Sequence, residues 1–143
     1  MTVESYVFME GEHDMIHSGV FNYINVMDKT LDAAWTRNEV ISNNIANVDT
    51  PGYKRQDVKF EDELRLALGS SRYKSVDAKV ADLKVGRLNP RTYTDYSNFS
   101  YRTDRNNVDI DTENVLLASN QLKYNAIMAG VNQEFSNLKL VMR

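Results

Sequence analysis

The sequence predicts a mainly α-helical protein in which two long terminal helices pair as an antiparallel, coiled-coil-like hairpin, with a small irregular and β-containing segment between them. Near both ends of the chain, apolar residues recur in alternating steps of four and three, and the middle lacks this period. The 143 residues can build one modest core but not two. We therefore divide the chain into a flexible N-terminal extension (1–17), an N-terminal helix (18–48), a middle segment with a turn motif and a short helix (49–107), and a C-terminal helix (108–143).

The N-terminal helix is predicted from a heptad pattern that we call the N-terminal seam. Its apolar members are Val20, Ile24, Met27, Leu31, Ala34, Ile41, Ile45 and Val48. Asn38 occupies the one polar position, where a buried amide can fix the register of a helix pair. An exposed Asn38 on a loosely packed helix explains the pattern equally well. Thirty residues of helix would span roughly 45 Å.

A turn is predicted directly after this helix. Pro51 disfavours the α conformation at Thr50, and Pro51-Gly52 suits a type II turn, whose second central residue needs a positive φ. The helix should therefore end near Val48.

The middle segment begins with an extended stretch after Tyr53. A short amphipathic helix follows over 60–68, where Phe60, Leu64 and Leu68 share a face, and Gly69 ends it. We expect residues 70–107 to be irregular with some strand. Two patterns support strand: the alternation of Val76, Ala78 and Val80, and an aromatic cluster of Tyr93, Tyr96, Phe99 and Tyr101.

The C-terminal helix carries a second heptad pattern, which we call the C-terminal seam. Leu117, Tyr124, Val131 and Leu138 alternate with Gln121, Met128, Phe135 and Met142. Asp109, Asp111 and Thr112 are all suitable N-caps, and Glu113 places negative charge at the positive end of the helix dipole. Antiparallel pairing would bring Val48 and Leu117 to the same end and Asn38 within a turn of Gln121 or Tyr124.

The composition argues against several classes of function. Basic and acidic residues number 17 and 20, with no basic cluster, so nucleic acid is not an expected partner. The absence of cysteine excludes disulfides and thiolate chemistry. The apolar runs are too short for a transmembrane segment, and residues 1–14 are acidic and do not resemble a cleaved signal peptide.

Candidate catalytic and metal-binding residues have simpler explanations. His13 and His17 share the i, i+4 spacing of zinc ligands, but no third ligand is evident, so we expect solvated histidines. The acidic run Glu61 to Glu63 fits a solvated helix face, and Asp109 with Asp111 fits helix capping. We expect no enzyme activity, no cofactor, no metal and no small-molecule substrate.

The cluster of Asn43, Asn44 and Asn47 is costly for a helix, because asparagine is a mediocre helix former. In the seam register Asn43 and Asn47 point outward and Asn44 flanks the seam. These amides suit hydrogen bonding to a neighbouring chain, whereas fraying of the helix before Pro51 is the simpler explanation.

Two separated blocks of sequence resemble one family. The run from Ile41 to Arg55, which contains Asn-Asn-Ile-Ala-Asn-Val-Asp-Thr-Pro-Gly-Tyr-Lys, is similar to the N-terminal motif of flagellar rod, hook and hook-associated proteins. The second block runs from Asn106 to Glu113 and continues through Tyr124 to a terminal Phe135-Ser136-Asn137-Leu138-Lys139. In so short a chain, the combination resembles the proximal rod proteins of the bacterial flagellar basal body.

The resemblance implies a structural subunit of the proximal rod, required for flagellum assembly and motility. Such a subunit would be exported by the flagellar type III apparatus and would polymerise through its terminal helices in the cell envelope, outside the cytoplasmic membrane. Its partners would be itself, other rod proteins, and export-gate and basal-body components. The implied subunit interface is the motif Asn43, Asn44, Asn47, Thr50, Pro51, Gly52 and Tyr53. The alternative is a coiled-coil adaptor or chaperone that forms a closed dimer, and a small hydrolase has only His13 and His17 in its favour.

Overall fold

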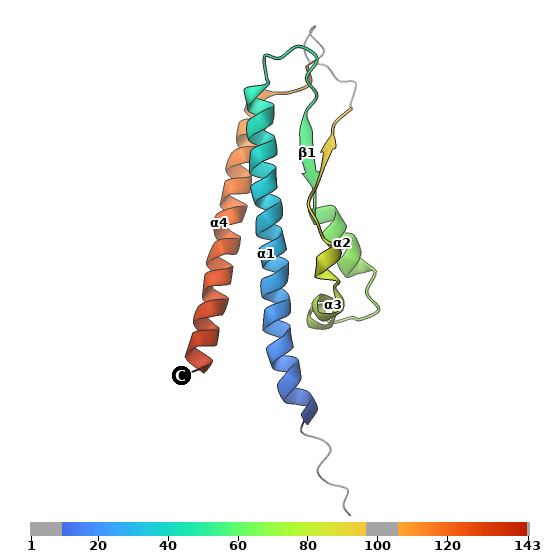
Figure 1. Cartoon of the computed structure of the whole chain (residues 1–143), viewed down its shortest axis with the longest axis vertical. Coiled ribbons are helices and arrows are strands. Elements are labelled where there is room, and N and C mark those ends of the chain that lie inside the picture. The colour runs from blue at the N-terminus through green and yellow to red at the C-terminus, as the bar shows by residue number, and fades with distance from the viewer. Residues whose placement is uncertain (1–9, 97–105, 143) are drawn as a thin grey trace, which may run out of the picture.

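The computed structural model describes residues 10–96 and 106–142, with side chains from residue 19 onward. Two long helices and a small middle unit form the fold (Figure 1). In chain order the elements are α1 (Glu10–Ala46), β1 (Gln56–Lys59), α2 (Glu61–Gly69), α3 (Val76–Asp82), the 3-10 helix η1 (Val85–Arg87), β2 (Arg91–Thr94) and α4 (Ile110–Val141). Among the described residues, none of the helices combines the length and apolar character needed to cross a membrane.

The helices α1 and α4 lie side by side and antiparallel, as predicted (Figure 1). Near one end, the Asn44 amide donates to Glu113, and in the middle the Asn120 amide donates to Asn38. Farther along the pair, the side chain of Met27 lies beside Gly130. Asn38 therefore does meet α4 within a turn of Gln121. Helix α1 begins at Glu10 rather than at residue 18, so part of the predicted flexible extension is helical.

The N-terminal seam faces inward along its length. Ala34 and Ile41 are buried, and Ile24, Met27, Leu31 and Ile45 are partly buried. In the C-terminal seam, the set Leu117, Tyr124, Val131 and Leu138 is also partly buried.

The other half of the C-terminal seam was assigned wrongly. Met128 is 37% exposed and Phe135 is 53% exposed, so neither is buried against α1. Asn120 and Ile127, which precede the predicted seam residues Gln121 and Met128 by one position, are less exposed and lie deeper in the α1–α4 contact. The reason is a polar contact: α4 is rotated so that the Asn120 amide donates to the Ala34 carbonyl at 2.8 Å. The heptad pattern was built from apolar residues, so it did not place Asn120 in the contact.

The predicted turn follows α1. The Tyr53 amide donates to the Thr50 carbonyl at 3.2 Å, and Gly52 has a φ of 74°. The chain then becomes extended as β1, which pairs antiparallel with β2 in the register Gln56↔Thr94 to Lys59↔Arg91.

The short helices of the middle segment correct one prediction and confirm another. Helix α2 forms where expected and ends at Gly69. Residues 76–82 form a helix rather than a strand, because the Ser75 hydroxyl accepts from the Ala78 amide at 3.2 Å and caps it. Only Val80 of this helix is buried, so the alternation of Val76, Ala78 and Val80 did not mark a buried strand face. Phe99 and Tyr101 of the predicted aromatic cluster lie outside the described residues.

A small core lies between α1 and the middle unit. Its buried members are Ala33, Val40, Val58, Phe60 and Leu88. Leu64, Ala67 and Leu83 pack against them. Helix α1 thus has α4 on one side and the middle unit on the other (Figure 1).

Replacing Gly52 with alanine should destabilise the protein by about 1 kcal/mol, because an L-residue is strained at a φ of 74° although no atom would clash with the new Cβ. Gly69→Ala is the matched control, since Gly69 lies in a helix with equally open space and without a positive φ. Urea unfolding monitored by circular dichroism measures both changes. Equal stabilities of the two variants would contradict the expected strain at the turn.

Candidate functional site

The two sequence blocks meet at one end of the helix pair, where α1 ends and α4 begins. We call the polar cluster formed there by Asn44, Arg55, Asn106, Asn107 and Glu113 the junction. Asn44, Asn106 and Glu113 have no exposed surface. Buried polar groups need partners, so the contacts among these side chains determine how the helices join.

Asn44 uses every hydrogen-bonding position of its amide. Its Nδ2 donates to the Gln56 carbonyl at 2.7 Å and to Glu113 Oε2 at 3.0 Å. Its Oδ1 accepts from the Gln56 amide at 3.0 Å and from the Tyr53 hydroxyl at 3.3 Å. Asn44 therefore joins α1 to the first residue of β1 and to α4.

Arg55 neutralises the buried carboxylate of Glu113. Its Nε lies 2.6 Å from Glu113 Oε1, and its Nη2 lies 3.1 Å from Asp57 Oδ2. Burial acts to lower the pKa of Arg55, but the hydrogen bonds and charges of Glu113 and, secondarily, Asp57 together outweigh it and raise that pKa above its ordinary value. Burial, and secondarily the Glu113 charge, raise the pKa of Tyr53, which keeps its hydroxyl protonated as a donor. Removing either partner of this ion pair would leave the charge of the other uncompensated in a largely buried place.

Asn106 caps the end of α1 from a distant part of the sequence. Its Nδ2 lies 3.0, 2.7 and 3.1 Å from the carbonyl oxygens of Asn47, Val48 and Thr50. These carbonyls lie at and beyond the last turn of the helix, where no backbone N–H group of a following turn is available to bond them. Asn107 continues the link, since its Oδ1 accepts from the Arg55 amide at 2.7 Å.

A second ion-pair group joins α1 to the middle unit. The Arg37 guanidinium makes a two-pronged contact with Glu61 and donates to the Val58 carbonyl at 2.9 Å. The hydrogen bond from Arg37 lowers the pKa of Glu61 to about 2. Because the side chain of Glu61 is half exposed, the contribution of this pair to stability is modest, and it is lost as the pH falls through that pKa.

The predicted interface motif divides into two parts. Asn44 and Tyr53 point inward and bond within the chain. The prediction that Asn44 offers its amide to a neighbouring chain is therefore wrong, because all its hydrogen-bonding positions are occupied. Asn47 is partly buried and donates to the Asn43 carbonyl at 2.8 Å. Asn43, Thr50, Pro51 and Gly52 are exposed, and their role as a subunit interface stays a prediction.

Sequence reasoning missed the roles of Asn106, Glu113 and Asn120. Glu113 was explained by the helix dipole, yet its carboxylate is buried against Arg55. The available signal was the presence of Arg55 in one sequence block and Glu113 in the other, which are opposite charges at the predicted meeting point of the helices. The role of Asn120 could not be predicted, because no local sequence pattern around it indicates that its amide bonds to Ala34 and Asn38.

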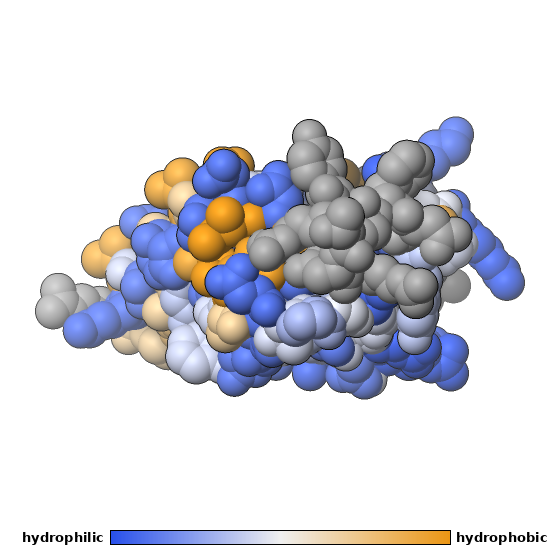
Figure 2. Space-filling view, turned by 90° about the horizontal axis from the view of Figure 1, so that it is seen from above, coloured by the Kyte–Doolittle hydropathy of each residue, from blue (hydrophilic) through white to orange (hydrophobic). Residues whose placement is uncertain are grey.

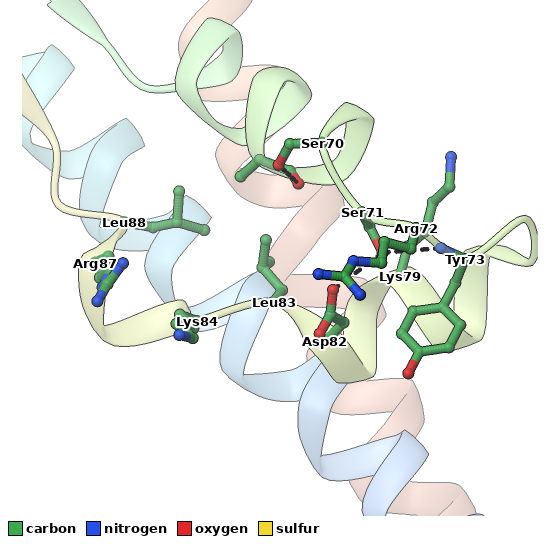
Figure 3. Close-up of a pocket in the computed structure, with 11 residues that line it drawn as sticks. Ser70, Ser71, Arg72, Tyr73, Lys79, Asp82, Leu83, Lys84, Arg87 and Leu88 are labelled. Carbon is green, nitrogen blue, oxygen red and sulfur yellow. Dashed lines mark hydrogen bonds between the residues drawn. The ribbon is translucent and has the colours of Figure 1, made fainter.

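The chain also has a surface cleft of about 520 Å³ between α2, α3 and η1. Leu83 and Leu88 point into it, and Asp82 lies beside Arg72 (Figure 3). Ser70 donates to the Ala67 carbonyl, and Ser71 donates to Asp82. Neither hydroxyl is therefore paired with a histidine or lysine that could activate it as a nucleophile. Among the described residues, no group of three histidine, cysteine, aspartate or glutamate side chains could hold a metal ion. The side chains of His13 and His17 lie outside the described part of the chain.

Comparison with known proteins identifies similar chains. A family model described as "Flagella basal body rod protein" matches residues 24–54. The flagellar basal body rod protein FlgB of Bacillus subtilis is 35% identical over 124 residues, which cover 83% of this chain and 92% of the relative. FlgB of Borreliella burgdorferi is 31% identical, covering 84% and 95%, and FlgB of Buchnera aphidicola from Acyrthosiphon pisum is 30% identical, covering 87% and 99%.

Replacing Asn44 with alanine should destabilise the protein by about 3 kcal/mol, because Gln56 and the buried Glu113 lose partners. Asn44→Asp should cost more, since it keeps the shape but places a second carboxylate against Glu113. Asn43→Ala, at an exposed neighbouring position, is the control and should change stability by less than about 0.5 kcal/mol. Chemical denaturation of all three variants measures these differences, and similar costs at Asn43 and Asn44 would contradict the role given to Asn44.

Proposed function

We propose, from the premise that this chain belongs to the FlgB family of flagellar basal body rod proteins, that it is a subunit of the proximal rod and polymerises through α1 and α4. The chain is a structural protein of the flagellar basal body rod. The proposal adds export by the flagellar type III apparatus, a place in the envelope outside the cytoplasmic membrane, and a requirement for flagellum assembly and motility. The rod, export-gate and basal-body components would be its partners.

The observation that carries the proposal is the exposure of apolar side chains along α4. Of its 32 residues, only Glu113 and Asn120 are buried, and both are polar. Large apolar side chains are exposed over its whole length: Val115, Leu122, Met128, Phe135, Leu140 and Val141. A helix with apolar residues on several faces is normally surrounded by other elements. Contacts with neighbouring subunits would supply those elements.

Two further features support the proposal. The chain contains no cysteine, so passage in an unfolded state would break no disulfide. Its core is small, with nine buried apolar residues among those that the structure describes, which lowers the free energy of unfolding before export. The exposed motif residues Asn43, Thr50, Pro51 and Gly52 lie at the end of the helix pair, where an axial neighbour would reach them.

The double variant Leu122→Asp/Phe135→Asp should abolish polymerisation and motility, because it places charge on two faces of α4 that neighbours would cover. Both side chains are exposed, at 71% and 53%, so the folded monomer should keep its helical circular dichroism. Sedimentation of the purified protein over a range of concentrations measures polymerisation, and complementation of a deletion strain measures motility.

The matched control is Asn125→Asp/Asn132→Asp, which adds the same charge at exposed polar positions of α4 and should leave polymerisation intact. A wild-type protein that stops at a dimer at all concentrations would favour the closed-dimer adaptor. Normal polymerisation by the Leu122→Asp/Phe135→Asp variant would refute assembly through the terminal helices.

A further inference from the structure

We propose that the surface cleft between α2, α3 and η1 binds an acidic peptide segment of a neighbouring protein. We call it the basic cleft, because its lining includes the four cations Arg72, Lys79, Lys84 and Arg87. Asp82 is the one acidic residue among the described residues that line it, so four positive charges less one negative leave a formal charge of +3. The whole chain has a formal net charge of −3. Positive charge is therefore concentrated at this cleft against the balance of the chain, and such a cleft attracts anions.

The fold does not use the four cations of the basic cleft. Ion pairs among the described residues take their cations from elsewhere, namely Lys29, Arg37, Arg55, Arg65 and Lys123. Within the part of the chain that the structure describes, none of the four cationic side chains of the cleft forms an ion pair or a hydrogen bond. Asp82 accepts from the Ser71 hydroxyl at 3.1 Å. A ligand can therefore pair with these cations without breaking a contact inside the protein.

The cations form two pairs on opposite sides of an apolar centre. In Figure 3, Lys84 and Arg87 lie on one side of Leu83, and Arg72 and Lys79 lie on the other. A single phosphate ion is held best by cations that converge on one point. Two separated pairs instead suit a ligand with negative charge at both ends and an apolar group between them. An extended peptide advances about 3.3 Å per residue, so a segment of about six residues can place carboxylates on both sides of an apolar side chain.

The apolar centre of the cleft is held in place by the small core. Leu88 is buried in that core, and Leu83 packs against it. Tyr73, which also lines the cleft, is 54% exposed. An exposed tyrosine beside a fixed apolar floor is typical of protein–protein contacts, where aromatic side chains supply much of the binding energy. These residues favour a protein segment over a small anion as the ligand.

The basic cleft lies away from the surface proposed for polymerisation. The helices α2 and α3 lie beside α1 on the side opposite α4 (Figure 1). Seen from above, hydrophobic residues gather on the side of α4, and the coloured surface toward the middle unit is mostly hydrophilic (Figure 2). Because the four cations surround a concave site rather than a flat face, they suit a peptide better than a membrane surface. Peptide binding at this cleft is therefore independent of polymerisation.

Fluorescence anisotropy with a labelled peptide of sequence Glu-Asp-Leu-Leu-Asp-Glu tests the basic cleft. Wild type should bind this peptide, and added salt should weaken the binding, because it screens the charges. Lys84→Glu/Arg87→Glu should weaken binding at least about tenfold, since one pair of cations becomes a pair of anions. Both side chains are exposed, so this variant should keep the helical circular dichroism of the wild type. The matched control is Arg91→Glu/Lys139→Glu, which makes the same change in net charge at exposed positions outside the cleft and should bind like the wild type.

Two further peptides test which ligand the cleft prefers. The uncharged Gln-Asn-Leu-Leu-Asn-Gln should not bind, and Glu-Asp-Ser-Ser-Asp-Glu should bind at least about threefold more weakly, because it lacks the apolar centre.

Several outcomes would overturn the assignment of an acidic peptide to this cleft. One is equal binding of Glu-Asp-Leu-Leu-Asp-Glu by wild type and Lys84→Glu/Arg87→Glu, and another is no binding by wild type. Displacement of the peptide by inorganic phosphate, with no loss of affinity when serine replaces leucine, would indicate a phosphate site instead. Wild type that sediments with phosphatidylglycerol vesicles but does not bind the peptide would indicate a membrane surface. None of these outcomes bears on polymerisation, which sedimentation of the protein alone measures separately.

Discussion

The carboxylate of Glu113 is buried in the first turn of α4, and the rest of the helix pair depends on how that charge is compensated. An isolated buried carboxylate would cost several kcal/mol, so it must meet a cation and hydrogen-bond donors. Arg55 supplies the charge and Asn44 supplies a donor, and the two come from opposite sides of the turn at Pro51. The start of α4 is thereby fixed beside the end of α1, which leaves α4 to run back along α1 in the antiparallel direction.

Farther along the pair, the polar contact between Asn120 and Asn38 sets the rotation of α4 about its own axis. A buried amide in a helix seam commonly fixes register at some cost in stability. With that rotation, the partly buried seam turns toward α1 and the remaining apolar residues of α4 face outward. The residues that fix the geometry are thus largely separate from those proposed to make contacts between subunits. The family motif, through Asn44, Tyr53 and Arg55, shapes the subunit, and the exposed apolar residues of α4 are left for assembly.

Sequence reasoning predicted what depends on local or periodic signals. The two helices, their antiparallel pairing, the turn with a positive φ at Gly52 and the short helix ending at Gly69 were all predicted correctly. The helix over 76–82 was missed because its cap at Ser75 is a weaker signal than the alternation of Val76, Ala78 and Val80. The roles of Met128 and Phe135 were wrong because polar Asn120 takes the place beside α1. The junction was not predicted, since its bonds join residues up to 69 positions apart and no short motif specifies such pairs.

The most direct test of the junction is a double-mutant cycle with Arg55→Met, Glu113→Gln and the double variant, followed by chemical denaturation. Arg55→Met alone should destabilise the protein by about 3 kcal/mol or more, because the Glu113 carboxylate stays buried without its cation. Adding Glu113→Gln removes that charge, so the double variant should be more stable than the sum of the single changes predicts, by about 2 kcal/mol. Single effects that add to within about 0.5 kcal/mol would show that Arg55 and Glu113 act independently and would contradict the claim that compensation of this charge fixes the helix pair.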